Sequence, residues 1–158
     1  MTGSSWILFF HVLAALWLTA GVFGSTVIRA QTKKVRDFKA KAFGIRLLAR
    51  SVKVFSVPGS VVAGVLGLYL VAARGYRFDS PWVILSSAIW FAMLSVTLFY
   101  IAPKVLQLAA AVEAAVAAGE PNPQLDRLMA NKLPGILGDV NALGIVILVL
   151  LMTVKPGG

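Results

Sequence analysis

The 158-residue chain contains no cysteine, a single histidine, His11, and only six acidic residues. Without cysteine it forms no disulfide, no thiolate metal site and no covalent attachment of haem. It also carries no phosphate-binding glycine loop, no zinc-hydrolase motif and no nucleophile elbow. These absences argue against hydrolysis of the kind that soluble enzymes perform, and we expect a noncatalytic protein.

Long hydrophobic runs fill the chain instead. Hydrophobic residues make up 59% of it and the mean hydropathy is +0.86, whereas a soluble domain is roughly 45–50% apolar. A hydrocarbon core about 30 Å thick needs about 20 apolar residues per helix, and four stretches qualify: 6–28, 54–73, 82–102 and 136–154. The sequence therefore predicts an all-α fold, a transmembrane four-helix bundle formed by one integral membrane domain over residues 1–158.

Positive charge is concentrated between the first two predicted spans. The formal net charge is +9, and the segment from Arg29 to Lys53 carries nine basic residues against one acid, Asp37. Loops rich in lysine and arginine stay on the cytoplasmic side of a membrane. We therefore expect this segment in the cytoplasm and both termini on the periplasmic side of a bacterial inner membrane.

Apolar residues recur within this basic segment at steps of three and four, which places them on one side of a helix: Val35, Phe38, Ala42, Ile45, Ala49, Val52 and Phe55. The pattern predicts an amphipathic helix lying on the cytoplasmic membrane surface with its apolar side in the bilayer. Pro58 and Gly59 predict a bend that separates this helix from the second span.

The cations of that helix then face anionic lipid headgroups, each at about 1 kcal/mol: Lys33, Lys34, Arg36, Lys39, Lys41 and Arg46. An acidic partner protein is the alternative ligand of this surface. No nucleic-acid-binding motif accompanies the charge, so we expect no nucleic acid.

The connection between the third and fourth spans is also predicted to be helical. Pro103 is expected to kink the start of an alanine-rich extension of the third span, residues 104–120, because alanine has the highest helix propensity. Asn122 then predicts a helix cap and Pro123 the first position of a short helix that ends before Pro134.

Small residues lie four apart in every predicted span, a spacing that lets helix backbones approach closely in lipid: Ala20 and Gly24, Gly21 and Ser25, Ser60 and Gly64, Ala63 and Gly67, Ala88 and Ala92, and Gly138 and Ala142. This spacing favours a compact bundle. Trp6, Tyr69, Tyr76 and Trp82 cluster near the outer interface, as an aromatic belt does.

His11 lies in the first predicted span, roughly 7–8 Å below Trp6 at 1.5 Å per residue. A polar ring in hydrocarbon faces the bundle rather than lipid, and two interpretations stay open. One is a structural hydrogen bond to Ser86 or Ser87 of the third span. The other is a ligand to haem or copper, with a second ligand supplied by Met152 at similar depth, by a symmetric dimer or by a partner subunit.

Asp139 lies one turn into the fourth span, where an unpaired carboxylate is costly. We expect an ion pair with Arg29, Arg50 or Lys53; a proton relay is the alternative, although no second buried acid continues it. Asn141 lies on another face of the same helix and predicts an interhelical hydrogen bond.

The segment HVLAALWLTAGVFG, residues 11–24, resembles a group of small bacterial membrane proteins. The group includes uncharacterised four-span families, the membrane domain of CopD-type copper-resistance proteins and the HemJ-type protoporphyrinogen oxidases, and the similarity is greatest to the uncharacterised kind. The resemblance implies that His11 can be a haem or metal ligand. The chain departs from the haem and copper patterns in having no histidine or lysine in its second to fourth spans.

Two functions follow from these observations. The first is a noncatalytic integral membrane protein, either a small accessory subunit of a membrane complex or a self-associating bundle. The second is a haem- or copper-binding membrane redox protein that uses His11. Small-solute transport is disfavoured because the spans offer few polar groups to line a path.

The orientation can be tested in intact cells. We expect residues 33–53 to be inaccessible to a periplasmic protease or a labelling reagent, because their positive charge keeps them in the cytoplasm. Labelling of this segment without permeabilisation of the inner membrane would reverse the orientation.

Overall fold

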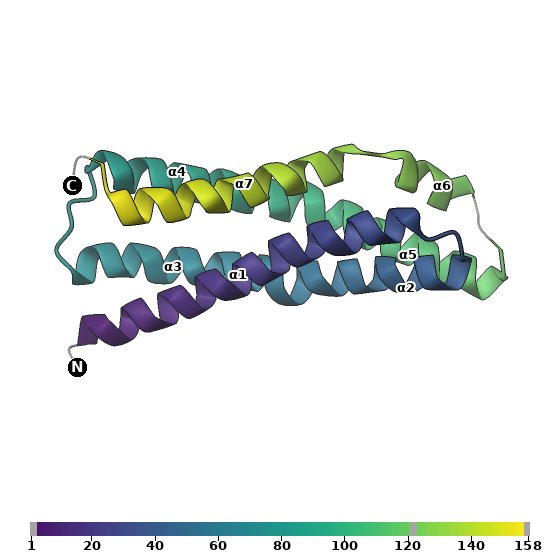
Figure 1. The fold of residues 1–158 in the computed structure, drawn as a ribbon, viewed down its shortest axis with the longest axis horizontal. Coiled ribbons are helices and arrows are strands. Elements are labelled where there is room, and N and C mark those ends of the chain that lie inside the picture. The colour runs from purple at the N-terminus through teal and green to yellow at the C-terminus, as the bar shows by residue number, and fades with distance from the viewer. Residues whose placement is uncertain (1–2, 121–122, 157–158) are drawn as a thin grey trace.

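The computed structural model describes residues 3–120 and 123–156, and these residues form helices joined by short connections (Figure 1). The elements in chain order are α1 (Gly3–Lys34), α2 (Phe38–Ser51), the π-helix η1 (Val52–Ser56), α3 (Val57–Ala73), α4 (Pro81–Val96), the π-helix η2 (Thr97–Ile101), α5 (Ala102–Ala118), α6 (Pro123–Ala130) and α7 (Leu133–Val154). Four stretches are long and apolar enough to cross a membrane. The predicted all-α, four-span architecture is confirmed.

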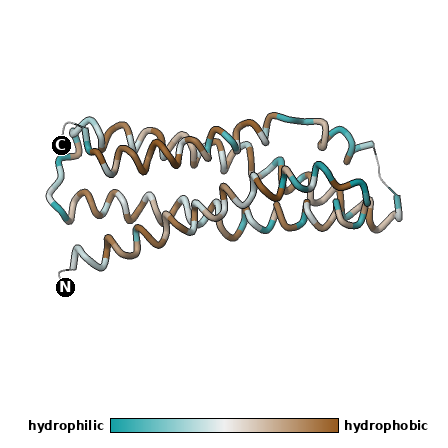
Figure 2. The backbone as a smooth tube through the Cα atoms, viewed as in Figure 1, coloured by the Kyte–Doolittle hydropathy of each residue, from teal (hydrophilic) through white to brown (hydrophobic). Residues whose placement is uncertain are grey.

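The helices run along one long axis with two different ends. Both termini and the α3–α4 connection lie at one end, called here the terminal end, and the α1–α2 and α5–α6 connections lie at the other, called the basic end (Figure 1). Figure 2 shows hydrophobic residues along most of α3, α4 and α7, and hydrophilic ones gathered at the basic end and in the α3–α4 connection. Composition thus separates an apolar middle from more polar ends.

Three of the four spans are longer than a bilayer requires. The 32 residues of α1, the 36 from Phe38 to Ala73 and the 38 from Pro81 to Ala118 extend over about 48, 54 and 57 Å at 1.5 Å per residue. A hydrocarbon core is about 30 Å thick. The excess length lies at the basic end, where α2, α5, α6 and the last turns of α1 form a second bundle.

The predicted bend at Pro58 does not separate α2 from the second span. The helix continues from Phe38 to Ala73, and the π-helix η1 accommodates the proline: the Val57 amide donates to the Val52 carbonyl, one residue further back than in an α-helix. The same device precedes Pro103, where the Ala102 amide donates to the Thr97 carbonyl in η2. Both prolines are therefore absorbed within long helices.

The apolar side of α2 packs on protein rather than on lipid, which corrects the predicted surface helix. Ala42 and Ile45 are 1% and 3% exposed and pack with Ala111, Val112 and Ala115 of α5. The alanine-rich face of α5 allows this close contact, and outside the bilayer the burial of apolar surface is favourable. A helix at the membrane surface and a helix packed on a neighbour have the same periodicity, so the sequence did not separate them.

The connection after α5 has the predicted helices. Gly119, with φ of 81°, ends α5 in the left-handed conformation that favours glycine. The short helix α6 then packs Leu125, 2% exposed, on the α2–α5 pair. The predicted cap at Asn122 lies outside the described residues.

Packing of α2 on α5 can be tested at Ala115, which is fully buried. We expect Ala115→Leu to lower the free energy of unfolding by about 1–3 kcal/mol because the larger side chain overpacks the contact. Ala114→Leu is the matched control, since Ala114 is exposed on the same helix. Thermal unfolding in detergent measures both, and equal melting temperatures would mean that α2 does not rest on this face.

Candidate functional site

His11 points from α1 toward α3 and is 8% exposed. Its Nδ1 lies 2.9 Å from the carbonyl oxygen of Ala63. A carbonyl only accepts, so Nδ1 carries the proton and the lone pair lies on Nε2. The structure thus supplies a backbone partner for the imidazole in place of the predicted Ser86 or Ser87.

Gly67 makes room for this contact. A Cβ atom at Gly67 would lie 3.0 Å from Cε1 of His11, tighter than most real contacts, so the imidazole rests on bare backbone one turn beyond Ala63. Ala63 and Gly67, which the sequence indicated as a packing motif, therefore form the surface of α3 on which the His11 ring packs. Small residues at such positions allow backbones to approach closely.

A cavity of about 430 Å³ lies beside His11 in the terminal half of the bundle, between α1, α3, α4 and α7. We call it the histidine cavity. Its walls are mostly apolar, and Met152 of α7 lines it together with His11. The structure therefore brings both members of the proposed ligand pair to one cavity.

Two buried polar atoms of this cavity have no hydrogen-bond partner within residues 3–120 and 123–156: Nε1 of Trp82 and Oγ of Ser86. Both residues are 6% exposed and line the cavity. By contrast, Nε1 of Trp90 donates to the Ser60 carbonyl oxygen at 2.9 Å. A buried polar group without a partner costs about 1–3 kcal/mol, and both of these groups belong to α4.

Cations border the cavity at the terminal end. Arg74 and Lys155 line it, and the ammonium group of Lys155 donates to the Tyr76 hydroxyl at 2.7 Å and lies 5.7 Å from the centre of the Trp82 ring. This hydrogen bond lowers the pKa of Tyr76, which lies in the α3–α4 connection. The mouth of the histidine cavity is therefore positively charged.

The backbone of Lys155 is arranged for this contact. Among the described residues it is the one non-glycine residue with positive φ, 47°, a conformation that costs an ordinary residue about 1–2 kcal/mol. The left-handed turn ends α7, with the Lys155 amide bonded to the Leu151 carbonyl. The chain accepts this strain at the residue whose side chain reaches Tyr76.

Asp139 forms an ion pair with Arg29 of α1 and also accepts from Thr26 Oγ1 at 3.4 Å. Of the three predicted partners, Arg29 lies at the carboxylate of Asp139. Neither Arg50 nor Lys53 forms an ion pair with a described residue. Gly135 provides the space, because a Cβ atom there would overlap the guanidinium group.

Asn141, 5% exposed, lies deeper in the bundle. Its side-chain amide donates to Thr97 Oγ1 of η2 at 2.9 Å, and Thr97 in turn donates to the Met93 carbonyl at 2.8 Å. This is an interhelical bond of the predicted kind. It ties α7 to the π-helix that precedes Pro103.

The basic residues of the 29–53 segment have different environments. Arg46, expected to face lipid, binds Glu113 of α5 through two hydrogen bonds of 2.5 and 2.7 Å. This pair corrects the expectation for Arg46, because α5 lies where lipid was expected. The remaining five cations lie around the basic end, and their contact with lipid stays a prediction: Lys33, Lys34, Arg36, Lys39 and Lys41.

Several residues of the site were missed from the sequence. The partner of His11 is the backbone carbonyl of Ala63, which no residue type in the sequence indicates. Lys155 lies beyond the predicted fourth span. Trp82 was assigned to an aromatic belt, yet it is 6% exposed and packs edge-on against Tyr76 with ring centres 5.3 Å apart. The signal that was present is the spacing of Ala63 and Gly67.

No group of three or more histidine, cysteine, aspartate or glutamate side chains that could hold a metal ion occurs within residues 3–120 and 123–156. A metal bound at His11 would therefore depend on Met152, on a cofactor's own donors or on another chain.

Four long apolar helices around a lined cavity define an integral membrane protein. Residues 5–156 match a sequence family described as predicted integral membrane protein, DUF2269. The chain belongs to this family. Comparison with curated proteins and with solved structures gave no match.

The unpartnered indole of Trp82 generates one prediction. Trp82→Phe removes an N–H that lacks an acceptor, so we expect the ligand-free protein to keep its melting temperature or gain slightly. Trp90→Phe is the control, because it removes the hydrogen bond from Trp90 to the Ser60 carbonyl oxygen. We expect it to lower the free energy of unfolding by about 0.5–1.5 kcal/mol. Equal losses in the two variants, measured by thermal unfolding in detergent, would show that the Trp82 indole already has a partner.

A second prediction concerns Asp139. Asp139→Asn is expected to lower the stability by about 0.2–1 kcal/mol, because the pair with Arg29 is partly exposed and screened by solvent. Asp126→Asn is the control, since Asp126 is an exposed carboxylate of α6. If the melting temperatures of the two variants in detergent agree, the ion pair contributes nothing to the fold.

Proposed function

We propose that the protein is a noncatalytic membrane subunit that would hold a haem in the histidine cavity, with His11 as a ligand to the iron. The observation that carries this proposal is the hydrogen bond from Nδ1 of His11 to the Ala63 carbonyl on the wall of an apolar cavity. Histidines that bind metals commonly donate their other ring nitrogen to a carbonyl in this way, which fixes the tautomer and the ring orientation.

The residues of the cavity fit such a group. Its apolar walls suit a porphyrin, Met152 would offer a thioether as a second ligand, and Arg74 and Lys155 at the mouth suit carboxylates. The unpartnered Trp82 and Ser86 donors supply two further polar contacts. When bound, haem would provide one-electron chemistry in the membrane.

The residues of this chain would then hold and shield the cofactor. His11 positions it through Ala63 and Gly67, and the surrounding leucines and valines exclude water. The protein would then exchange electrons with a neighbouring protein, which supports the role of a small accessory subunit. Self-association is the second arrangement, since a symmetric copy could supply a ligand in place of Met152.

The orientation belongs to the same proposal. The cluster of cations at the basic end supports placing that end in the cytoplasm of a bacterium. The terminal end and the mouth of the histidine cavity would then face the periplasm. An electron partner would meet the protein in the outer half of the inner membrane.

The test is an absorption spectrum of the full-length protein purified in detergent from haem-supplied cells. We expect a Soret band that is lost in His11→Ala and retained in Leu148→Ala, a control that truncates another buried residue of the cavity wall. Met152→Leu is expected to keep the haem and shift its reduced spectrum, because the sixth ligand changes.

The opposite result is a folded, monodisperse protein that stays colourless and free of iron. That result would remove the haem and leave the accessory subunit or self-associating bundle as the proposed role. Stoichiometric membrane proteins that copurify with the chain would then support the subunit, and cross-linked homodimers would support self-association.

A further inference from the structure

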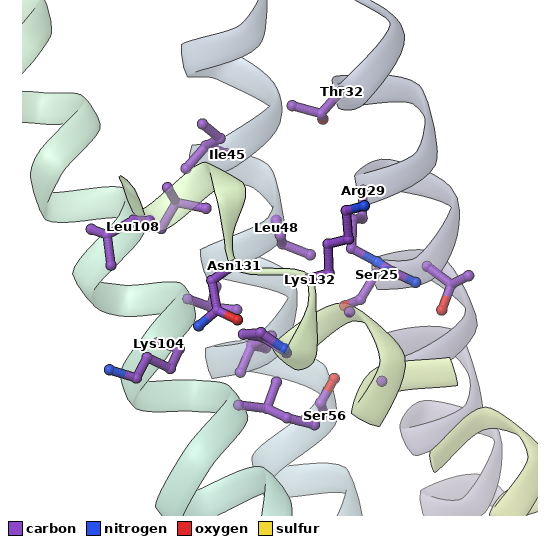
Figure 3. Close-up of a pocket in the computed structure, with 18 of the residues that line it drawn as sticks. Ser25, Arg29, Thr32, Ile45, Leu48, Ser56, Lys104, Leu108, Asn131 and Lys132 are labelled. Carbon is purple, nitrogen blue, oxygen red and sulfur yellow. The ribbon is translucent and has the colours of Figure 1, made fainter. Parts of the chain in front are cut away.

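A second cavity lies at the basic end, between α1, α2, α5, α6 and the start of α7, and is separate from the histidine cavity. Figure 3 shows its surroundings: Ser25, Arg29 and Thr32 from α1, Ile45 and Leu48 from α2, and Asn131 and Lys132 from the α6–α7 connection. It encloses about 140 Å³. We call it the basic cavity.

Charge in the basic cavity is one-sided. Four of its lining residues are cationic, Arg29, Lys33, Lys104 and Lys132, and no lining residue is acidic. Asp139 neutralises Arg29 from outside the lining, and the ammonium group of Lys104 turns to Gln107 on its own helix at 3.2 Å. Lys33, Lys104 and Lys132 have no acidic partner among the described residues. The cavity therefore offers three cations without an acidic partner to an anion, of which Lys104 is already hydrogen-bonded to a neutral amide.

Its deeper part is apolar apart from the hydroxyl group of Ser56. Val22, Val52 and Ile101 line it together with Ser56, which is 5% exposed. This wall suits a ligand with an oxygen acceptor next to hydrocarbon.

We propose that the basic cavity binds the phosphate headgroup of an anionic phospholipid. It lies where the apolar spans give way to the charged end of the bundle, the level at which headgroups lie. Its volume of about 140 Å³ is roughly ten times the 10–15 Å³ that one water needs, which is room for a phosphate and part of a glycerol. The acyl chains would leave along the exposed apolar residues of α7, Leu133, Ile136 and Val140.

This site differs from the lipid surface that the sequence predicted. There, six cations of the 29–53 segment faced headgroups along an apolar stripe, but the structure buries most of that stripe against α5 and α6. The inferred site combines Lys33 with Lys132, which lie 99 positions apart in the sequence and meet around one cavity. It does not depend on the haem proposal.

The experiment uses the full-length protein in an uncharged detergent and measures phosphatidylglycerol binding by native mass spectrometry. Phosphatidylcholine is the comparison lipid. The test variant is Lys33→Gln with Lys132→Gln, and the control is Lys34→Gln with Lys39→Gln, which removes the same charge from exposed positions outside the cavity. Arg29 stays unchanged because it holds Asp139.

We expect phosphatidylglycerol to bind better than phosphatidylcholine, with a loss of about fivefold per cavity lysine removed and less than twofold in the control. A double Lys33→Arg, Lys132→Arg variant should retain binding, which checks that the glutamine variant fails for lack of charge rather than of folding. Equal losses in test and control variants, or no preference for the anionic lipid, would overturn the proposal. Displacement of the lipid by millimolar inorganic phosphate would also overturn it, since the site would then be one for a free anion.

Discussion

Close approach of helix backbones in lipid is the constraint on which this structure depends. Burial of one apolar side chain against another gains little in hydrocarbon, so packing and a few polar contacts hold the helices together. Glycines allow both: a Cβ at Gly59 would lie 2.8 Å from the Leu18 backbone nitrogen, and one at Gly21 would lie 2.7 Å from that of Ser56. These contacts join α1 to the helix formed by α2 and α3.

The same constraint places the polar side chains. His11 rests on Gly67, Arg29 reaches Asp139 over Gly135, and Trp90 lies against Gly64 while donating to the Ser60 carbonyl. Each of these three polar side chains thus reaches its partner beside a glycine, which leaves space for it. Where no such partner exists, at Trp82 and Ser86, a cavity lies alongside instead.

Much of the architecture follows from the sequence because hydrophobic length and helix breakers are local signals. The four spans, the alanine-rich extension and the short helix after Pro123 could all be predicted in this way. The partner of the amphipathic stripe could not, because periodicity identifies a face without saying what covers it. For Arg46 the outcome depended on the position of Glu113, 67 residues away.

Only part of the candidate site could be predicted from the sequence. His11 and Met152 stood out by their chemistry, and the structure places both on one cavity. The carbonyl that orients His11 belongs to the backbone, which leaves no trace in residue identity. Pro58 and Pro103 were visible as breakers, but whether a helix kinks or takes up a π turn depends on how tightly its neighbours hold it.

The two π turns determine how the halves of the molecule face each other. A π turn amounts to one residue inserted into an α-helix, and one residue corresponds to about 100° of rotation. The side chains of α2 and α5 are therefore rotated about the helix axis by about 100°, relative to their positions in an uninterrupted helix. The helix formed by α2 and α3 and the helix formed by α4 and α5 each contain one such turn. The face that each helix presents to its neighbours therefore differs between the terminal half and the basic half of the molecule. A substitution on a face in one half thus leaves the packing faces of the other half unchanged.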